Sequence, residues 1–120
     1  MKQQDKELLL RDLCARLPHS VMIQYYNCEP LQVVGVSGCF VEIGGLRVNF
    51  DECKPYLRPM SSMTDEEKKE VFSCISNAWN LTASNQIDYL NSHHFDYRGL
   101  IEKGLAIEAP NGMYDLSYFK

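Results

Sequence analysis

The chain has 120 residues, of which 45% are hydrophobic and 11% aromatic, and its formal net charge is −4. This composition excludes an intrinsically disordered chain and allows one domain with its own core. Residues 1–60 carry seven basic and seven acidic side chains, whereas residues 61–120 carry five and nine. A broad basic surface for nucleic acid is therefore missing from the second half, and a local basic stripe in the first half stays open.

Neither a leader nor a disulfide scaffold is predicted. The start of the chain is charged, and its apolar run at residues 8–10 is too short for a signal-peptide core. No later segment is apolar enough to cross a membrane, so we expect a cytoplasmic protein. The cysteines are odd in number and form no Cys-x-x-Cys pair, which predicts free thiols rather than a zinc site. They are Cys14, Cys28, Cys39, Cys53 and Cys74.

The first predicted element is a helix over residues 4–16. Leu9, Leu13 and Leu17 recur at a spacing of four and form an apolar stripe, while the charged residues, Asp12 and Arg16 among them, fall mostly outside it. Pro18 then ends the helix.

Residues 19–50 change to a period of two, which is typical of strands. Four short strands are expected, at residues 21–26, 31–37, 39–43 and 46–50. Gly44 and Gly45 between the last two predict a tight hairpin turn. This arrangement favours an antiparallel β meander or a small SH3-like barrel, with the first helix covering one face.

Residues 51–63 are expected to connect two parts of one compact α+β unit. Pro55 and Pro59 argue against a regular helix or a central strand in this connector. The boundary near residue 60 separates residues 1–60, the helix and β meander, from residues 61–120, a helical lobe that ends in a hairpin.

The second half opens with the clearest helix signal. Thr64 and Glu67 form a capping box. The apolar positions that follow predict a buried stripe of Val71, Phe72, Ile75, Ala78 and Trp79. A shorter helix over residues 86–93 should bury Ile87 and Leu90.

The last predicted elements are short. Asp96 is placed to cap a helix that runs through Lys103 and ends at Gly104. A hairpin should then follow, with strands at 105–108 and 113–116 around the turn at 110–112.

The sequence nominates no catalytic residue, no cofactor site and no metal site. His93, His94 and Asp96 form a cluster that could hold a metal or act in acid–base chemistry, but adjacent histidines on a helix point about 100° apart. The alternative is a helix end in which His94 packs inward, His93 lies near the helix C-terminus and Asp96 caps the next turn. Asp51 and Glu52 could act as a paired carboxylate in acid–base chemistry, and the favoured alternative is a solvated turn after a strand.

Aromatic and basic residues interleave in the first half. Arg47, Lys54 and Arg58 could contact phosphates while Tyr25, Tyr26 or Tyr56 stack on bases. The alternative is that half of these rings belong to the core and the rest are scattered on the surface.

Two stretches between residues 54 and 106 resemble a known group of proteins. They are Lys54-Pro55-Tyr56-Leu57-Arg58-Pro59-Met60-Ser61-Ser62-Met63-Thr64-Asp65-Glu66-Glu67 and His93-His94-Phe95-Asp96-Tyr97-Arg98-Gly99-Leu100-Ile101-Glu102-Lys103-Gly104-Leu105-Ala106. They are similar to short, uncharacterised proteins of gut anaerobic bacteria and their phages and integrated elements. The resemblance implies a small cytoplasmic accessory protein of a mobile element, and it carries no site residue. Tyr97 and Arg98 are contact candidates if both are exposed.

Three functions follow as hypotheses. The first is a non-enzymatic protein that binds a protein partner or a second copy of itself, without a cofactor and without a membrane. The second is a nucleic-acid-binding module that uses the β-rich half. The third is a metal-dependent hydrolase built on His93, His94 and Asp96.

Overall fold

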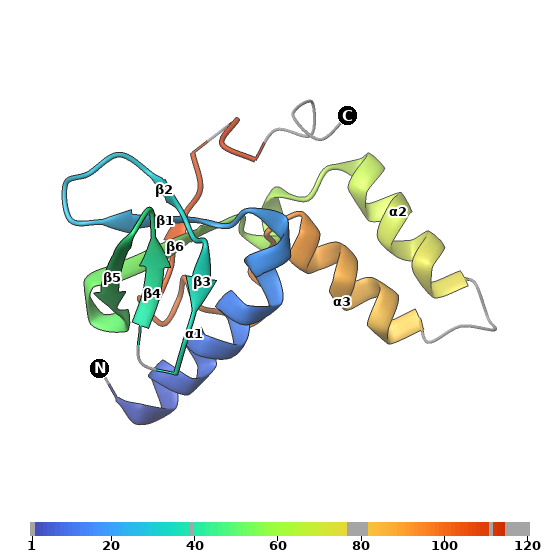
Figure 1. Ribbon diagram of the computed structural model, residues 1–120. Helices are drawn as coiled ribbons and strands as arrows, with labels where there is room; N and C mark the ends of the chain where they lie inside the picture. The colour runs from blue at the N-terminus through green and yellow to red at the C-terminus, as the bar shows by residue number, and fades with distance from the viewer. Residues whose placement is uncertain (1, 39, 77–81, 111, 115–120) are drawn as a thin grey trace.

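The computed structural model describes residues 2–38, 40–76, 82–110 and 112–114, and for residues 71–76 and 82–85 it describes the backbone alone. Within these residues the protein is an α+β fold, as predicted, with a helix followed by two small sheets and a later pair of helices (Figure 1). The predicted stripe of Val71, Phe72, Ile75, Ala78 and Trp79 lies outside the side chains described.

Helix α1, Gln3–Arg16, covers the sheets with its apolar face. Leu9 and Leu13 are fully buried in the core, as the leucine spacing predicts, and a 3-10 turn, Leu17–His19, follows with Pro18 inside it. The placement of Asp12 and Arg16 outside the apolar stripe was wrong, because both side chains are fully buried. They are buried as a pair, with Arg16 Nε 2.8 Å from Asp12 Oδ2.

One sheet has the strand order β2-β1-β6-β7. Its strands are β1, Met22–Tyr25, β2, Leu31–Gln32, β6, Cys53–Leu57, and β7, Ile107–Glu108. The first three pair antiparallel, and β7 pairs with β6 in parallel.

The second sheet is an antiparallel meander of β3, Gly35–Val36, β4, Phe40–Ile43, and β5, Leu46–Asn49. Its hairpin turn is the predicted one: Gly44 and Gly45 have φ values of 50° and 86°, which favour glycine. The single strand predicted over residues 31–37 is divided into β2 and β3, which belong to different sheets. The SH3-like alternative stays a prediction.

Strand β6 corrects the prediction of a connector, because it is a central strand and contains Pro55. The C=O of Leu57 accepts the N–H of Ala109 at 2.8 Å, so it points toward β7. The backbone of Pro55, two residues earlier, points the same way. Pairing with β7 begins only at Tyr56, so the N–H that proline lacks has no partner to lose at that point.

Helices α2, Asp65–Ser76, and α3, Thr82–Ser92, pack together and project from the sheets (Figure 1). The capping box at the start of α2 is confirmed: Glu67 Oε1 accepts the Thr64 N–H at 2.9 Å, and Thr64 Oγ1 accepts the Glu67 N–H at 3.1 Å. Leu90 on α3 is buried as predicted, but Ile87 is 40% exposed.

Turns replace the short helix predicted from Asp96 to Lys103. Asp96 does cap this segment, since its two carboxylate oxygens accept the N–H groups of Leu100 and Ile101. Gly99 has a φ of 75°, outside the helical region, and this interrupts a regular helix. The predicted hairpin also differs: β7 pairs with β6, residues 113–114 are a turn, and residues 115–116 lie outside the description.

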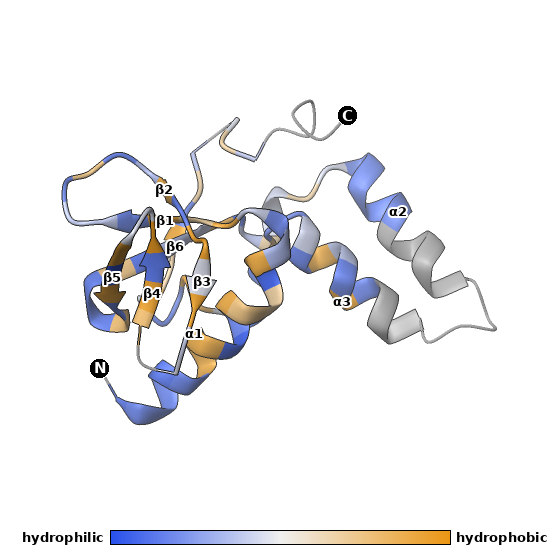
Figure 2. Ribbon diagram, viewed as in Figure 1, coloured by the Kyte–Doolittle hydropathy of each residue, from blue (hydrophilic) through white to orange (hydrophobic). Residues whose placement is uncertain are grey.

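One core joins both predicted halves. Leu100, Leu105 and Ala106 from the second half are buried together with Leu9 and Leu13 of α1 and the inward residues of the sheets. Figure 2 shows this pattern: apolar residues cover a side of α1, and the first turns of α2 are hydrophilic. Among the residues that the structure describes, no helix is long and apolar enough to cross a membrane.

Candidate functional site

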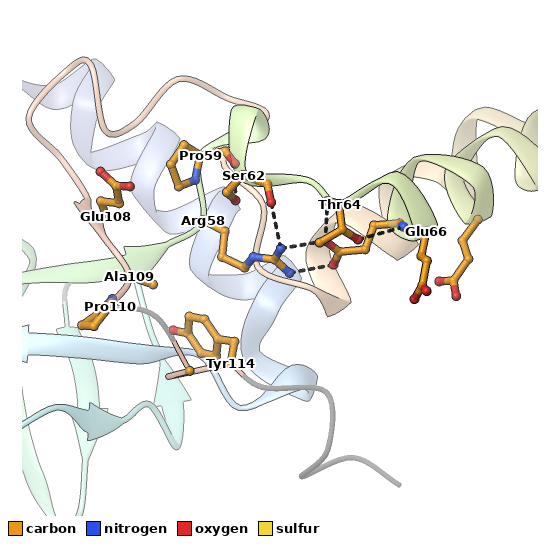
Figure 3. Close-up of a pocket in the computed structure, with 12 residues that line it drawn as sticks. Arg58, Pro59, Ser62, Thr64, Glu66, Glu108, Ala109, Pro110 and Tyr114 are labelled. Atoms are coloured by element: carbon orange, nitrogen blue, oxygen red, sulfur yellow. Dashed lines mark hydrogen bonds and ion pairs between the residues drawn. The ribbon is translucent and has the colours of Figure 1, made fainter.

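A cleft of about 480 Å³ lies between the start of α2 and the segment that follows β7 (Figure 3). Its walls combine carboxylates with short apolar and hydroxyl side chains. The lining residues are Arg58, Pro59, Ser62, Thr64, Glu66, Glu67, Glu70, Glu108, Ala109, Pro110, Gly112 and Tyr114.

Arg58, the cation in this lining, is fully engaged by the protein itself. Its Nη1 and Nη2 each lie 2.7 Å from one oxygen of Glu67, and its guanidinium lies over the ring of Phe95 at 4.2 Å. Burial alone would raise the pKa of Glu67, but hydrogen bonds from Arg58 and Thr64 and the charge of Arg58 lower it to about 2. The pair therefore adds no net charge to the cleft.

The remaining carboxylates give the cleft a negative charge. The side chains of Glu66 and Glu108 are exposed and make no hydrogen bond or ion pair with another described residue. Glu70 accepts a hydrogen bond from Tyr89 at 2.7 Å, and burial together with this carboxylate raises the pKa of Tyr89. A concave surface of one sign attracts groups of the opposite sign, so this cleft suits a cationic ligand.

Tyr114 closes one wall of the cleft. Its hydroxyl accepts the Met22 N–H at 2.8 Å and donates to the Tyr56 C=O at 2.8 Å. Its ring stacks on the imidazole of His94 with centroids 3.9 Å apart. Burial is the first cause that raises the pKa of Tyr114, so the hydroxyl keeps its proton at neutral pH.

The structure gives His93, His94 and Asp96 separate surroundings. His94 is fully buried, its Nε2 lies 2.8 Å from the His19 carbonyl, and burial with the nearby Arg16 charge lowers its pKa to about 3. The ring of His93 stacks on Tyr89 instead. The Asp96 carboxylate caps the following turn. Within the described residues, no three histidine, cysteine, aspartate or glutamate side chains form a group that could hold a metal.

Tyr97 and Arg98 are half-buried and belong to a polar network that the sequence analysis missed. Arg98 Nε lies 3.2 Å from Asp12, and Arg98 Nη2 donates to the Tyr97 hydroxyl at 2.9 Å. The same Asp12 carboxylate binds Arg16, which also donates to the Phe95 carbonyl. The aspartate–arginine spacing of four on a helix was the available signal, because such residues are neighbours on one face.

The interleaved residues of the first half do not form one surface. Tyr56 is buried, so its ring cannot stack on a base, and Arg58 is held by Glu67. Lys54 is exposed on β6, and Arg47 is exposed on β5, where it lies 3.5 Å from Glu42. These two are the exposed cations among the six predicted contact residues.

Glu52 and Tyr26 form an exposed pair near the end of β1. Tyr26 is 62% exposed, and its hydroxyl donates to Glu52 at 2.8 Å. The Asn49 N–H and the Tyr26 hydroxyl lower the pKa of Glu52. Asp51 lines a second hollow of about 440 Å³ beside α1. The Glu52 carboxylate is committed to the 3-10 turn Phe50–Glu52, which it caps.

Comparison with known proteins gives no match: no protein-family model, no curated protein and no solved structure resembles the chain significantly.

Proposed function

We propose that the protein is a non-enzymatic accessory protein that binds a partner protein, and that its acidic cleft receives a basic segment of that partner. The supporting observation is the charge of the cleft. Glu66 and Glu108 have no cationic partner among the described residues, while Arg58 is neutralised by Glu67. The prolines and the tyrosine of the lining offer apolar contact for the stems of lysine or arginine side chains.

Origin in a phage or mobile element and a cytoplasmic location are part of this proposal. The first is supported by the resemblance of the two sequence stretches. The second is supported by three free thiols, Cys14, Cys28 and Cys53, which suit a reducing compartment. A second copy of the chain is the other candidate partner, and sedimentation velocity of the purified protein distinguishes the two.

The nucleic-acid alternative has less support, because Arg58 and Tyr56 are committed to the fold. Arg47 and Lys54 remain for phosphate contacts, and a cleft rich in carboxylates repels a polyanion. The hydrolase alternative has the least support, since hydrogen bonds to backbone groups occupy both carboxylate oxygens of Asp96 and one ring nitrogen of His94.

The test is a selection of random peptides on the purified protein, followed by titration of the selected peptides. We expect enrichment in lysine and arginine and binding that weakens as salt rises. The double variant E66Q/E108Q should weaken binding at least tenfold. The matched control is E29Q/E102Q, which removes the same two charges from exposed positions outside the cleft. Selection of peptides without basic residues, or equal binding by the two variants, would contradict the proposal.

A further inference from the structure

The turn at residues 112–114 is bound to the rest of the protein by hydrogen bonds of one side chain, Tyr114. The Tyr114 hydroxyl bonds to Met22 N–H and to Tyr56 C=O, and it lies 3.4 Å from the Met22 carbonyl. The Met113 N–H bonds to Pro110 within the same segment at 3.1 Å. Among the residues described, the turn makes no other hydrogen bond to the body of the protein, so its attachment depends on Tyr114.

The hydroxyl of Tyr114 replaces one backbone hydrogen bond between β1 and β6. These strands pair Ile23 with Pro55, so the next position brings Met22 opposite Tyr56. At this position the Met22 N–H and the Tyr56 C=O do not bond to each other. Both bond to the Tyr114 hydroxyl instead. If Tyr114 leaves, the gap presents an unpaired donor and an unpaired acceptor.

The residue beneath Tyr114 has two unfavourable features in this arrangement. His94 has a left-handed backbone with φ 60°, which is costly for a side-chain-bearing residue and is found at sites of function. Its Nδ1 is buried without a hydrogen-bond partner among the described residues. Departure of the stacked Tyr114 ring lets solvent or a ligand approach this imidazole, which favours opening.

Gly112 and Tyr114 also line the acidic cleft, and Figure 3 shows the Tyr114 ring there. We propose that residues 112–114 form a releasable latch, and that its opening extends the cleft to the Met22 N–H, the Tyr56 C=O and the His94 ring. The side chain that fits this slot is a phenol, because Tyr114 fills it in the closed state. The partner segment therefore places a tyrosine beside basic residues, a clause that rests on the proposed function.

Native-state amide exchange of the full chain tests the latch without any ligand. The Met22 amide should exchange at least tenfold faster than the Val33 amide, which bonds to Val21 at 3.0 Å in the same part of the sheet, and its rate should hardly respond to low denaturant. Tyr114→Phe removes the hydroxyl and should speed exchange of Met22 but not of Val33. If Met22 and Val33 exchange at one rate with the same denaturant dependence, Tyr114 is a fixed core contact and the latch is overturned.

Two peptides test what the opened slot accepts. Lys-Lys-Tyr-Lys-Lys should bind at least tenfold tighter than Lys-Lys-Ala-Lys-Lys and should change the Met22 exchange rate. Equal binding overturns the tyrosine slot and leaves the acidic cleft standing. If neither peptide binds, both the basic partner and the tyrosine slot are overturned. The amide-exchange experiment still decides whether residues 112–114 form a latch.

Discussion

The Arg58 guanidinium and the Glu67 carboxylate join the end of β6 to the start of α2, with both N–O distances at 2.7 Å. The same carboxylate caps the N–H of Thr64. The backbone of Arg58 adds a second connection, because its N–H bonds to the His94 carbonyl and its C=O accepts the Asp96 N–H. Arg58 thus links the sheet, the start of α2 and the turn after α3, and it lines the cleft.

Loss of the Glu67 charge should destabilise the protein. The side chains of Arg58 and Glu67 are only 18% and 5% exposed, so Glu67→Gln leaves a largely buried guanidinium without its counter-charge. We expect the free energy of unfolding to fall by about 2 kcal/mol, measured by urea denaturation. Glu66→Gln is the control on the same helical turn and should change stability by less than about 0.5 kcal/mol. Equal losses for the two variants would show that the Arg58–Glu67 ion pair does not contribute to the stability of the protein.

Asp12 should be the most sensitive carboxylate of α1. It is fully buried and holds both Arg16 and Arg98. Asp12→Asn leaves two guanidinium groups without a negative partner, so we expect a loss of about 3 kcal/mol or more in urea denaturation. Asp5→Asn makes the same change near the start of the same helix, outside this network, and should cost less than about 0.5 kcal/mol. A loss under about 1 kcal/mol for Asp12→Asn contradicts the role of the shared carboxylate.

Local signals in the sequence were sufficient for the parts of the fold that depend on neighbouring residues. The leucine spacing of α1, the Gly44-Gly45 turn and the Thr64–Glu67 capping box are all confirmed. Each depends on residues within four positions of one another, where periodicity and capping rules apply directly.

Features that depend on distant partners were missed. Pro55 was predicted to exclude a central strand because it lacks an N–H. Whether that missing N–H costs a hydrogen bond depends on where β7, about fifty residues later, begins to pair with β6. Asp12 and Arg16 were placed mostly outside the apolar stripe, and their burial was not predicted, because Arg98 and Tyr97, which complete their network, are more than eighty residues away in sequence. The cleft likewise combines Arg58, Glu66 and Glu108 from three separate segments. No local pattern reports such a combination.

The hairpin turn gives a matched pair of glycine substitutions. Gly45 has a φ of 86°, whereas no left-handed φ is found at Gly38, and an added methyl group meets no atom within 4 Å at either position. Gly45→Ala should therefore cost about 1 kcal/mol through backbone strain alone. Gly38→Ala should be neutral or stabilising by a few tenths, because it restricts the unfolded chain. The melting temperatures of both variants measure these stability changes. A larger loss for Gly38→Ala than for Gly45→Ala would show that Gly45 does not need its left-handed backbone.

The thiols should differ sharply in reactivity. Cys14 and Cys28 are exposed, whereas Cys53 is buried on β6, and burial followed by the charge of Glu52 raises its pKa to about 12. Alkylation of the native protein by iodoacetamide, read by mass spectrometry of peptides, should modify Cys53 at least a hundredfold more slowly than Cys14 or Cys28. Cys53 should react at their rate in denaturant. Equal rates in the native state would mean that β6 opens readily.

Protonation of His94 should make the protein less stable as the pH falls below about 6.5. Burial and the Arg16 charge lower its pKa from 6.5 to about 3, so between these values the unfolded chain binds a proton that the native protein does not. Stability must then fall with decreasing pH, by at most about 1.4 kcal/mol per pH unit. Glu67 contributes its own loss only below about 4.5, since its pKa is lowered from 4.5 to about 2.

Between pH 6.5 and pH 4.5 the stability therefore changes through His94 and not through Glu67. Urea denaturation should record a loss of about 2 kcal/mol in the free energy of unfolding over this interval. His94→Asn tolerates the left-handed backbone and has no titrating group, so its stability, whatever its absolute value, should change little over this interval. His93→Asn is the control, because His93 lies half-buried at the end of α3, and it should retain the slope of the unmodified protein. If His94→Asn keeps that slope as well, the imidazole of His94 does not need to be neutral in the folded protein.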